Sequence, residues 1–277
     1  MTSPRSLRSE LLDRPDPDPE VLARSLRDLE VVNRWLGGYR ALRQGLAPLR
    51  EVPEASGPVR ILDVGTGDGA TLLHLRRWAP PDWRFVGIEL SPDIVGVARR
   101  RLRTSGSPDP PDERRAGSAP RKSDPSRPVP PPRIRLVRSD GLHLPFEDRS
   151  FHAAVCTLTL HHFDDGAAVA LVREMARVAT RRVVVNDLER SALHYLGARL
   201  LSVTVWRNSP VTRHDGPLSV RRSFTRGELR RIGAAAGLRD LRVRRLFLFR
   251  LLLEGIPGRG DPDPGGRSGR DHEEEAS

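Results

Sequence analysis

Apolar positions along the chain alternate between two spacings, which predict strands and helices in turn. Short apolar runs that end in glycine or a polar residue predict buried strands at 59–64, 84–89, 134–137, 153–158 and 183–186. Apolar residues at helical spacing predict helices over 68–77, from 91 to about 103, and over 165–178. This alternation is typical of a parallel sheet whose strands are joined by crossover helices.

The segments on either side of this core have patterns of their own. Residues 1–55 predict a helical cap, with one helix over 21–36 and a second from about 39 to 49. After the last parallel strand, the pattern predicts a helix over 189–204, a loop over 205–222 and a helix over 225–236. Two strands are predicted within 239–253. The chain therefore divides into a cap over 1–55 and a main domain over 56–255.

Two segments have too few apolar residues to fold on their own. Residues 104–132 contain nine prolines and almost no large apolar side chain. Residues 256–277 are rich in glycine and proline and end in acidic residues. Both predict disorder, because burial of apolar surface would not offset the ordering entropy.

A glycine-rich loop between the first strand and the first helix of the core is the most informative motif. It contains Gly65, Gly67 and Gly69, which allow a sharp turn and a close approach of a ligand to the backbone. The helix behind it offers free N–H groups. Glu89 ends the next strand, where a carboxylate accepts the hydroxyl protons of a ribose. These features predict an adenosine-type ligand.

The same loop leaves more than one ligand open. Gly65, Gly67 and Ala70 also fit the dinucleotide pattern of NAD or FAD proteins, and a glycine turn without any ligand is a further alternative. Three acidic residues favour S-adenosylmethionine (SAM). Asp63 is placed to receive an ammonium group, and the charge of Asp68 would repel a pyrophosphate. Asp140 follows the third strand, where it would cap an adenine amino group.

Together these motifs resemble those of class I SAM-dependent methyltransferases, most closely the ubiquinone/menaquinone-biosynthesis-type small-molecule branch. The resemblance rests on 61–70, 87–91, 139–141, 144–151 and 160–163, and it covers roughly 56–103 and 133–253. It implies an α/β, Rossmann-like, seven-stranded and mostly parallel sheet with an antiparallel C-terminal hairpin. It also implies that residues of this chain contact the methionine end, the ribose and the adenine of SAM. The expected cofactor-binding residues are Asp63, Gly65, Thr66, Gly67, Gly69, Glu89, Leu90, Asp140, Gly141, Leu142 and Thr157.

Catalytic candidates follow from where the parallel strands end. Methyl transfer to a hydroxyl needs a group that removes a proton, and histidine is the natural base near neutral pH. His161 follows the fourth strand and is the first candidate, and His214 is the second. Asp187 ends the fifth strand and would orient a base or cap a helix. We identify no metal site, because no three ligands stand at a recognisable spacing.

Aromatic residues in the flanking segments are candidates for a lid over a planar acceptor, although aromatics at helical spacing are often simply core. The aromatic candidates are Trp35 and Tyr39 in the cap and Tyr195, Trp206 and Phe224 after the fifth strand, and Asn33 of the cap is a polar candidate beside them.

Composition narrows the class of protein. The formal net charge is +11, and 207–250 alone holds twelve arginines, which either form a solvated face or attract an anionic partner. The single cysteine, Cys156, excludes a disulfide framework and a multi-cysteine metal site. No secretory signal or membrane-spanning run is visible, so we expect a cytoplasmic protein. The oligomeric state is left open.

These observations predict an enzyme of secondary metabolism that methylates an oxygen or carbon of a small aromatic, quinone-like or polyketide-like acceptor. The basic charge keeps a nucleic-acid or protein methyltransferase open, but no RNA-binding module or Asn/Asp-Pro-Pro-aromatic motif is present, so a nucleic-acid partner is not expected. A non-catalytic SAM-binding protein and an NAD-dependent oxidoreductase are the remaining alternatives.

Overall fold

A computed structural model describes residues 4–13, 18–53, 57–106 and 133–258 of the 277-residue chain. Almost all of the segments predicted to be disordered, 104–132 and 256–277, lie outside the described residues.

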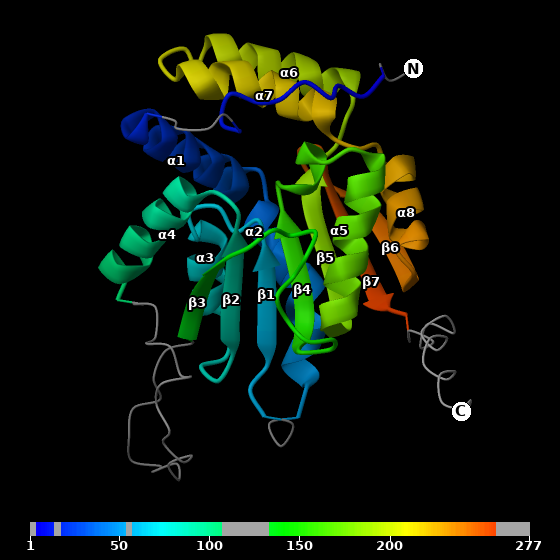
Figure 1. The fold of residues 1–277 in the computed structure, drawn as a ribbon. Coiled ribbons are helices and arrows are strands. Elements are labelled where there is room, and N and C mark those ends of the chain that lie inside the picture. Colours follow the sequence, from blue (N-terminus) through cyan, green and yellow to red (C-terminus); the bar gives the residue numbers. More distant parts are fainter. Residues whose placement is uncertain (1–3, 14–17, 54–56, 107–132, 259–277) are drawn as a thin grey trace, which may run out of the picture.

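Seven strands form a single mixed sheet in the order β3-β2-β1-β4-β5-β7-β6 (Figure 1). β1 to β5 are parallel, and β7 runs antiparallel to both β5 and β6. The strands are β1 Arg60–Val64, β2 Arg84–Glu89, β3 Arg133–Arg138, β4 Phe151–Thr157, β5 Ala179–Leu188, β6 Leu238–Leu246 and β7 Arg250–Pro257. The predicted fold class, including the antiparallel hairpin, is confirmed.

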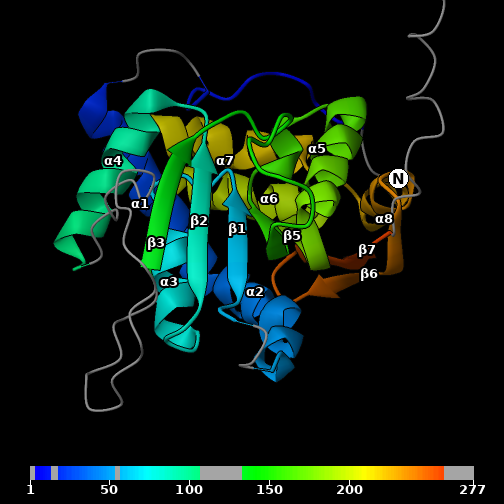
Figure 2. The same cartoon turned by 60° about the horizontal axis from the view of Figure 1, so that its bottom comes forward.

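Helices cover both faces of the sheet and divide the core in two. Successive strand residues point to opposite faces, so Ile61 packs with one cluster and Leu62 with the other. One face carries α2 Gly38–Leu46, α3 Ala70–Trp78 and α4 Pro92–Thr104. The other face carries α5 Asp165–Val178 and α8 Arg226–Ala235 (Figure 2).

A third layer lies over the edge of the sheet where the parallel strands end. It consists of α1 Pro19–Trp35, α6 Ala192–Val203, α7 Pro210–Arg222 and the N-terminal arm, residues 4–13 (Figure 1). The arm is bound to α7, because the N–H groups of Leu11 and Leu12 donate to the carboxylate of Asp215 at 2.9 and 3.0 Å. This layer closes the space above the sheet.

Two predicted boundaries were wrong. Residues 210–222 form α7, which contains Gly216 and Pro217, although the sequence predicted a loop over 205–222. Contacts with the arm and with α6 outweigh this low local helix propensity, and Pro210 at the first turn needs no hydrogen bond from its nitrogen. β7 continues through Pro257, two residues into the segment assigned to the tail.

Close packing of α2 on β5 depends on Gly45. A Cβ atom at Gly45 would lie 2.7 Å from Cγ1 of the buried Val184. We expect Gly45→Ala to lower the free energy of unfolding by about 1–2 kcal/mol, because overpacking outweighs the gain in helix propensity. Gly96→Ala in α4 is the matched control, and it should raise that free energy by up to about 1 kcal/mol. Urea denaturation of both variants measures this, and equal shifts would contradict the packing argument.

Candidate functional site

The glycine loop after β1 has backbone angles that favour glycine. Gly65, Gly67 and Gly69 have φ values of 70°, 58° and 77°. A Cβ at Gly65 would also lie 2.4 Å from Cγ2 of Thr159, so a larger residue there would clash with the loop after β4. Gly69 is the N-cap of α3, and the loop therefore turns its backbone toward the edge of the sheet.

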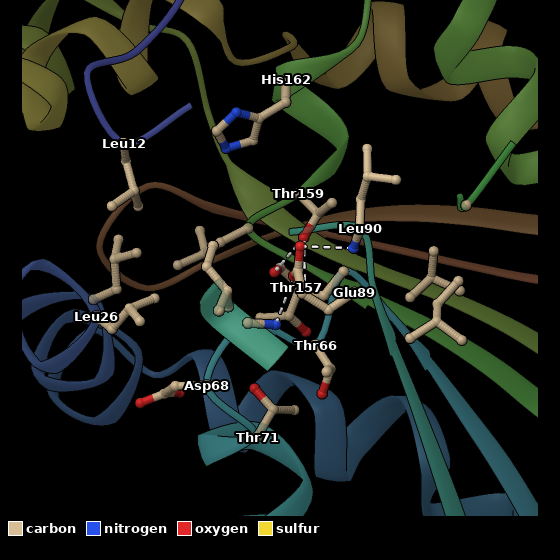
Figure 3. Close-up of a pocket in the computed structure, with 18 of the residues that line it drawn as sticks. Leu12, Leu26, Thr66, Asp68, Thr71, Glu89, Leu90, Thr157, Thr159 and His162 are labelled. Carbon is tan, nitrogen blue, oxygen red and sulfur yellow. Dashed lines mark hydrogen bonds between the residues drawn. The ribbon is translucent and has the colours of Figure 1, made fainter. Parts of the chain in front are cut away.

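Glu89 fixes this loop to the end of β2. Its carboxylate accepts hydrogen bonds from the backbone N–H groups of Gly67 at 3.1 Å and Leu90 at 2.8 Å (Figure 3). It also accepts one from the N–H of Ser91 at 3.1 Å. A carboxylate has about four acceptor positions, so it retains capacity for a ligand hydroxyl. Glu89 thus holds the loop open beside the place where a ribose is expected.

Asp63 is a buried carboxylate with one oxygen left unsatisfied. Its Oδ2 accepts a hydrogen bond from Oγ1 of Thr66 at 2.7 Å, whereas Oδ1 has no partner among the described residues. Burial raises the pKa of Asp63 to about 7, and the charge of Glu89 adds to this against the opposing hydrogen bond from Thr66. Because buried polar atoms are almost always paired, Oδ1 is suited to a cationic ligand group.

A cofactor-sized cavity of about 300 Å³ lies over this loop. Most of the predicted cofactor residues line it: Gly65, Thr66, Gly67, Glu89, Leu90, Asp140, Gly141 and Thr157. Three predicted residues do not. Asp63 is buried at the end of β1, and Gly69 caps α3. The Leu142 side chain packs against the core while its N–H donates to Asp140.

Asp68 does not present a free charge to this cavity. It forms an ion pair with Arg101, which also pairs with Glu30 of α1 at 2.5 Å. The sequence predicted that the charge of Asp68 would repel a pyrophosphate. This argument against a dinucleotide no longer holds, because Arg101 compensates the charge of Asp68. The three residues instead join the glycine loop to α4 and α1.

A second cavity, of about 360 Å³, lies under the helical layer. It is predominantly apolar and is enclosed by α1, α6, α7 and the turn between β6 and β7. The two cavities share four lining residues, Leu12, Leu29, Leu158 and His162. Molecules bound in the two cavities would therefore come into contact at this boundary.

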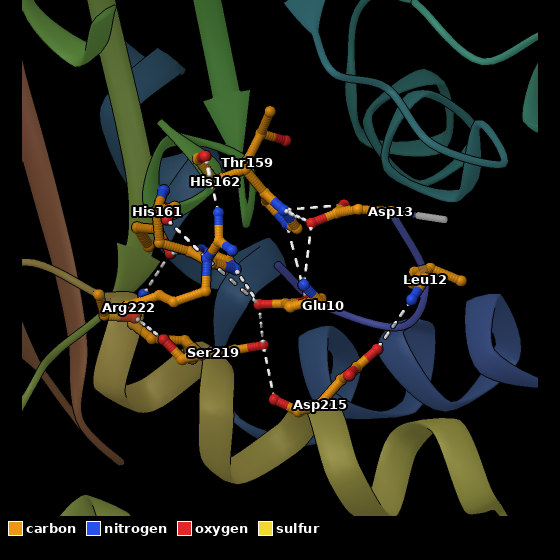
Figure 4. A network of polar contacts seen from close by, with 12 residues as sticks. Glu10, Leu12, Asp13, Thr159, His161, His162, Asp215, Ser219 and Arg222 are labelled. Carbon is orange, nitrogen blue, oxygen red and sulfur yellow. Dashed lines mark hydrogen bonds and ion pairs between the residues drawn. The ribbon is translucent and has the colours of Figure 1, made fainter. Parts of the chain in front are cut away.

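His161 stands between two carboxylates beside the boundary. Its Nδ1 lies 2.7 Å from Oδ1 of Asp187, and its Nε2 lies 3.6 Å from Oε1 of Glu10 (Figure 4). Burial alone would lower the pKa of His161, but the two carboxylates outweigh it and raise the pKa to about 10. The two carboxylates thus favour the protonated form of His161.

His162 has similar surroundings but faces the cavities. Its Nδ1 lies 3.1 Å from the carboxylate of Asp13, and its Nε2 lies 4.0 Å from Oε2 of Glu10. The two imidazole rings lie against each other with centroids 4.4 Å apart. Glu10 accepts a further hydrogen bond from Oγ of Ser219 at 2.7 Å. We call Glu10, His161 and His162 the boundary cluster.

The predicted catalytic residues are only partly brought together. His161 and Asp187 are in contact, so Asp187 orients the imidazole ring as predicted, but it also favours the protonated form of that ring. His214 lines neither cavity and lies half-exposed on α7 beside Asp215. Glu10 and Asp13 were missed. They come from an arm about 150 residues away in the sequence, and no local motif identifies them.

The aromatic candidates for a lid are mostly used elsewhere. Trp206 lines the second cavity. Tyr39 stacks on His74 with centroids 4.1 Å apart, and Phe224 belongs to the core. Trp35 is 75% exposed. Apolar aliphatic side chains, rather than an aromatic sandwich, therefore form most of the walls.

Comparisons with known proteins agree with this geometry. Residues 61–182 match the family model described as a methyltransferase domain. The demethylmenaquinone methyltransferase of Roseiflexus sp. (strain RS-1) is 32% identical over 130 residues, covering 47% of this chain and 42% of that protein. The demethylmenaquinone methyltransferase of Thermus thermophilus is 28% identical over 108 residues, covering 39% of this chain and 37% of that protein. The chain thus spans less than half the length of these curated relatives.

Solved structures share the fold. A SAM-dependent methyltransferase from Aquifex aeolicus has a TM-score of 0.55 at 16% identity, covering 87% of this chain and all of that one. Human N-acetylserotonin methyltransferase, in complex with SAM, has a TM-score of 0.56 at 12% identity, covering 87% of this chain and 57% of that one. Within the described residues, no helix has the length and apolar character needed to cross a membrane.

The raised pKa of Asp63 predicts how stability depends on pH. Between pH 4 and 7 the unfolded chain ionises Asp63 while the folded chain keeps the proton, so stability falls as pH rises through this window. We expect Asp63→Asn to be more stable than the wild type by about 2–4 kcal/mol at pH 8, and this advantage should shrink toward pH 4. Denaturation of both proteins across this range measures it. A pH-independent difference would contradict the burial argument.

Proposed function

The chain contains a methyltransferase domain of the class I SAM-dependent family, and from this premise we propose that it methylates a small apolar acceptor. The observation that carries this proposal is the shared boundary of the two cavities. One is lined by the glycine loop and the acidic residues that suit SAM, and the other is apolar. A methyl donor and an acceptor bound in them would meet beside His162.

The residues around the first cavity fit SAM. The unsatisfied Oδ1 of Asp63 would receive the ammonium of the methionine moiety, which would also relieve the cost of burying this carboxylate. Glu89 would accept the ribose hydroxyls with its remaining lone pairs. Asp140 lies on the cavity wall after β3, where it would cap the adenine amino group.

The acceptor is inferred from the second cavity. Its walls are largely aliphatic, with Trp206 and Phe249 as the aromatic members. A planar, apolar molecule with one polar edge would bury its rings there and present that edge to the boundary cluster. The sequence relatives named demethylmenaquinone methyltransferases make a reduced naphthoquinone the first acceptor class to test.

Methyl transfer here requires positioning, exclusion of water and handling of one proton. Bound SAM supplies an electrophilic methyl group on a sulfonium. The helical layer and the N-terminal arm cover the boundary, and the apolar walls would orient the acceptor for in-line attack. The boundary cluster is the polar group within reach of the acceptor's reacting edge, and Asp187 and Asp13 hold its two imidazole rings.

The contacts of the basic residues favour a small acceptor over a nucleic acid. Arg222 donates to backbone carbonyls, and Arg244 and Arg245 pair with Glu254 and Glu189. These arginines are therefore already used within the fold. Cys156 is fully buried and burial raises the pKa of its thiol, which does not suit a nucleophile for cytosine methylation.

The cofactor assignment is tested by calorimetry. We expect wild-type protein to bind SAM, and Asp63→Asn and Glu89→Gln to weaken that binding by about 10-fold or more, because each removes a charged partner of the cofactor. The exposed Asp82→Asn should bind as the wild type does. Since Asp63→Asn is expected to be the more stable protein at pH 8, unfolding would not explain its loss of affinity. Binding of NADH in place of SAM would overturn the assignment.

The acceptor cavity is tested by filling it. Gly197 lies on its wall, and a Cβ atom there would meet no atom within 4 Å. We expect Gly197→Phe to lower kcat/KM for a reduced, short-chain demethylated naphthoquinone by about 10-fold or more, with SAM affinity unchanged. Gly227→Phe on the exposed face of α8 is the matched control. Formation of S-adenosylhomocysteine is the readout, with a catechol and a flavonoid as alternative acceptors, and equal effects of both variants would contradict this cavity.

A further inference from the structure

Three potential metal ligands converge in the boundary cluster. One ligand atom each from Glu10, His161 and His162 lies within 4.8 Å of the others. Glu10 and His161 are buried, and His162 is partly buried. Two ligand atoms that share one first-row divalent ion lie roughly 3–3.6 Å apart, so the observed Nε2–Oε distances of 3.6 and 4.0 Å require only small movements.

Both histidines are held in the way that metal-binding histidines are held. Each directs its Nδ1 toward a carboxylate, Asp187 for His161 and Asp13 for His162. This arrangement places the donor proton on Nδ1 and leaves Nε2 facing Glu10 as a potential ligand. Glu10 is itself fixed by the hydroxyl of Ser219. The cluster therefore has the supporting contacts that orient a metal site, and not only the ligands.

Charged groups of both signs surround the two imidazole rings. Glu10, Asp13 and Asp187 contribute three carboxylates around the two imidazole rings. Arg222 has its Nε 3.8 Å from Oε1 of Glu10, and its guanidinium also donates to the carbonyls of His161 and His162. Arg5 and the buried Arg250 act on Asp187, so three guanidiniums balance the three carboxylates when both imidazoles are neutral. An ion that binds would therefore take the place of protons on the two imidazoles.

We propose that Glu10, His161 and His162 bind a divalent first-row transition ion through one carboxylate oxygen and two Nε2 atoms. Imidazole and carboxylate together suit Zn²⁺, Fe²⁺ or Co²⁺ better than Mg²⁺. Three protein ligands leave at least one coordination position open, and the site faces the apolar cavity. The ion and protons on Nε2 exclude each other, so the cluster acts as a metal centre and not as a histidine base.

The open position determines what the ion does to an acceptor. A hydroxyl of the acceptor that coordinates the ion becomes more acidic and loses its proton to water. A lone pair of that oxygen, or of the ring carbon conjugated with it, then forms the new bond to the methyl carbon. The carbon–sulfur bond breaks, and its electron pair stays on sulfur as S-adenosylhomocysteine; a ring carbon that has been methylated also loses its proton to water. This role rests on the proposed function, whereas metal binding does not.

The binding site is tested on the full chain without any acceptor. After treatment with a chelator and its removal, we expect one Zn²⁺ per chain by calorimetry and one Co²⁺ with visible d–d bands of a nitrogen and oxygen ligand set. Glu10→Gln and His162→Gln should each lower the affinity for either ion by about 100-fold or more. His214→Gln is the matched control, because it removes an exposed histidine that also lies beside a carboxylate, at 2.7 Å from Asp215.

The outcomes separate a built site from surface binding. Absence of saturable binding up to about 100 μM, or affinity unaffected by Glu10→Gln and His162→Gln, would overturn the proposal. Loss of the ion in His214→Gln would also overturn it, because that result would indicate an adventitious ion only. If Glu10→Gln does not fold, X-ray absorption of wild type loaded with Zn²⁺ decides, because the proposal requires two imidazole ligands.

The same preparation distinguishes this inference from the proposed function. SAM binding by a chain that binds no metal would overturn the metal site and leave the methyltransferase proposal intact. Metal binding with the expected loss in both variants, by a chain that binds no SAM, would support the site and contradict the proposed function. Binding of both, with methyl transfer abolished by the chelator and restored by the ion, would support the role in acceptor activation.

Discussion

The guanidinium of Arg222 joins three segments that are far apart in the sequence, and the arrangement above the sheet depends on it. It donates to the carbonyl oxygens of His161 at 3.2 Å and His162 at 2.7 Å, and also to that of Arg8. α7, the turn after β4 and the N-terminal arm are thereby fixed to one another. Because the side chain is buried, each unmade bond would leave an unpaired donor, so these segments are held together strongly.

The contacts of Arg222 help to position the residues of the boundary cluster. Glu10 reaches the two histidines only because the arm crosses α7, where Asp215 and Ser219 hold it. The donor side is built differently. Glu89 and Asp63 lie within the first two strands of the sheet and shape the glycine loop through short-range hydrogen bonds. The half of the site around the glycine loop is therefore built from residues close in the sequence, whereas the half around the boundary cluster is assembled from distant segments.

The contrast explains which parts of the site were predictable from sequence. Glycines at positive φ followed by a helix, and an acidic residue at the end of the next strand, leave a pattern within about 30 residues, and most of those residues line the first cavity. His214, the second candidate, lines neither cavity, and a lone histidine in the sequence gives no sign of its position. Asp68 was misjudged because its partner, Arg101, lies on the next helix. α7 was missed because Pro217 and Gly216 lower helix propensity while packing stabilises the helix.

The sequence by itself determined the alternation of strands and helices, the strand–glycine loop–helix unit and the acidic residues that suit an adenosine ligand. These depend on hydrophobic period and on backbone angles, both of which are local properties. The tertiary structure alone decided the second cavity, the pairing of His161 with Asp187 and the approach of Glu10 and Asp13 to the histidines. Such contacts join residues separated by 26 to about 150 positions, and their energies arise only once the chain has closed those loops.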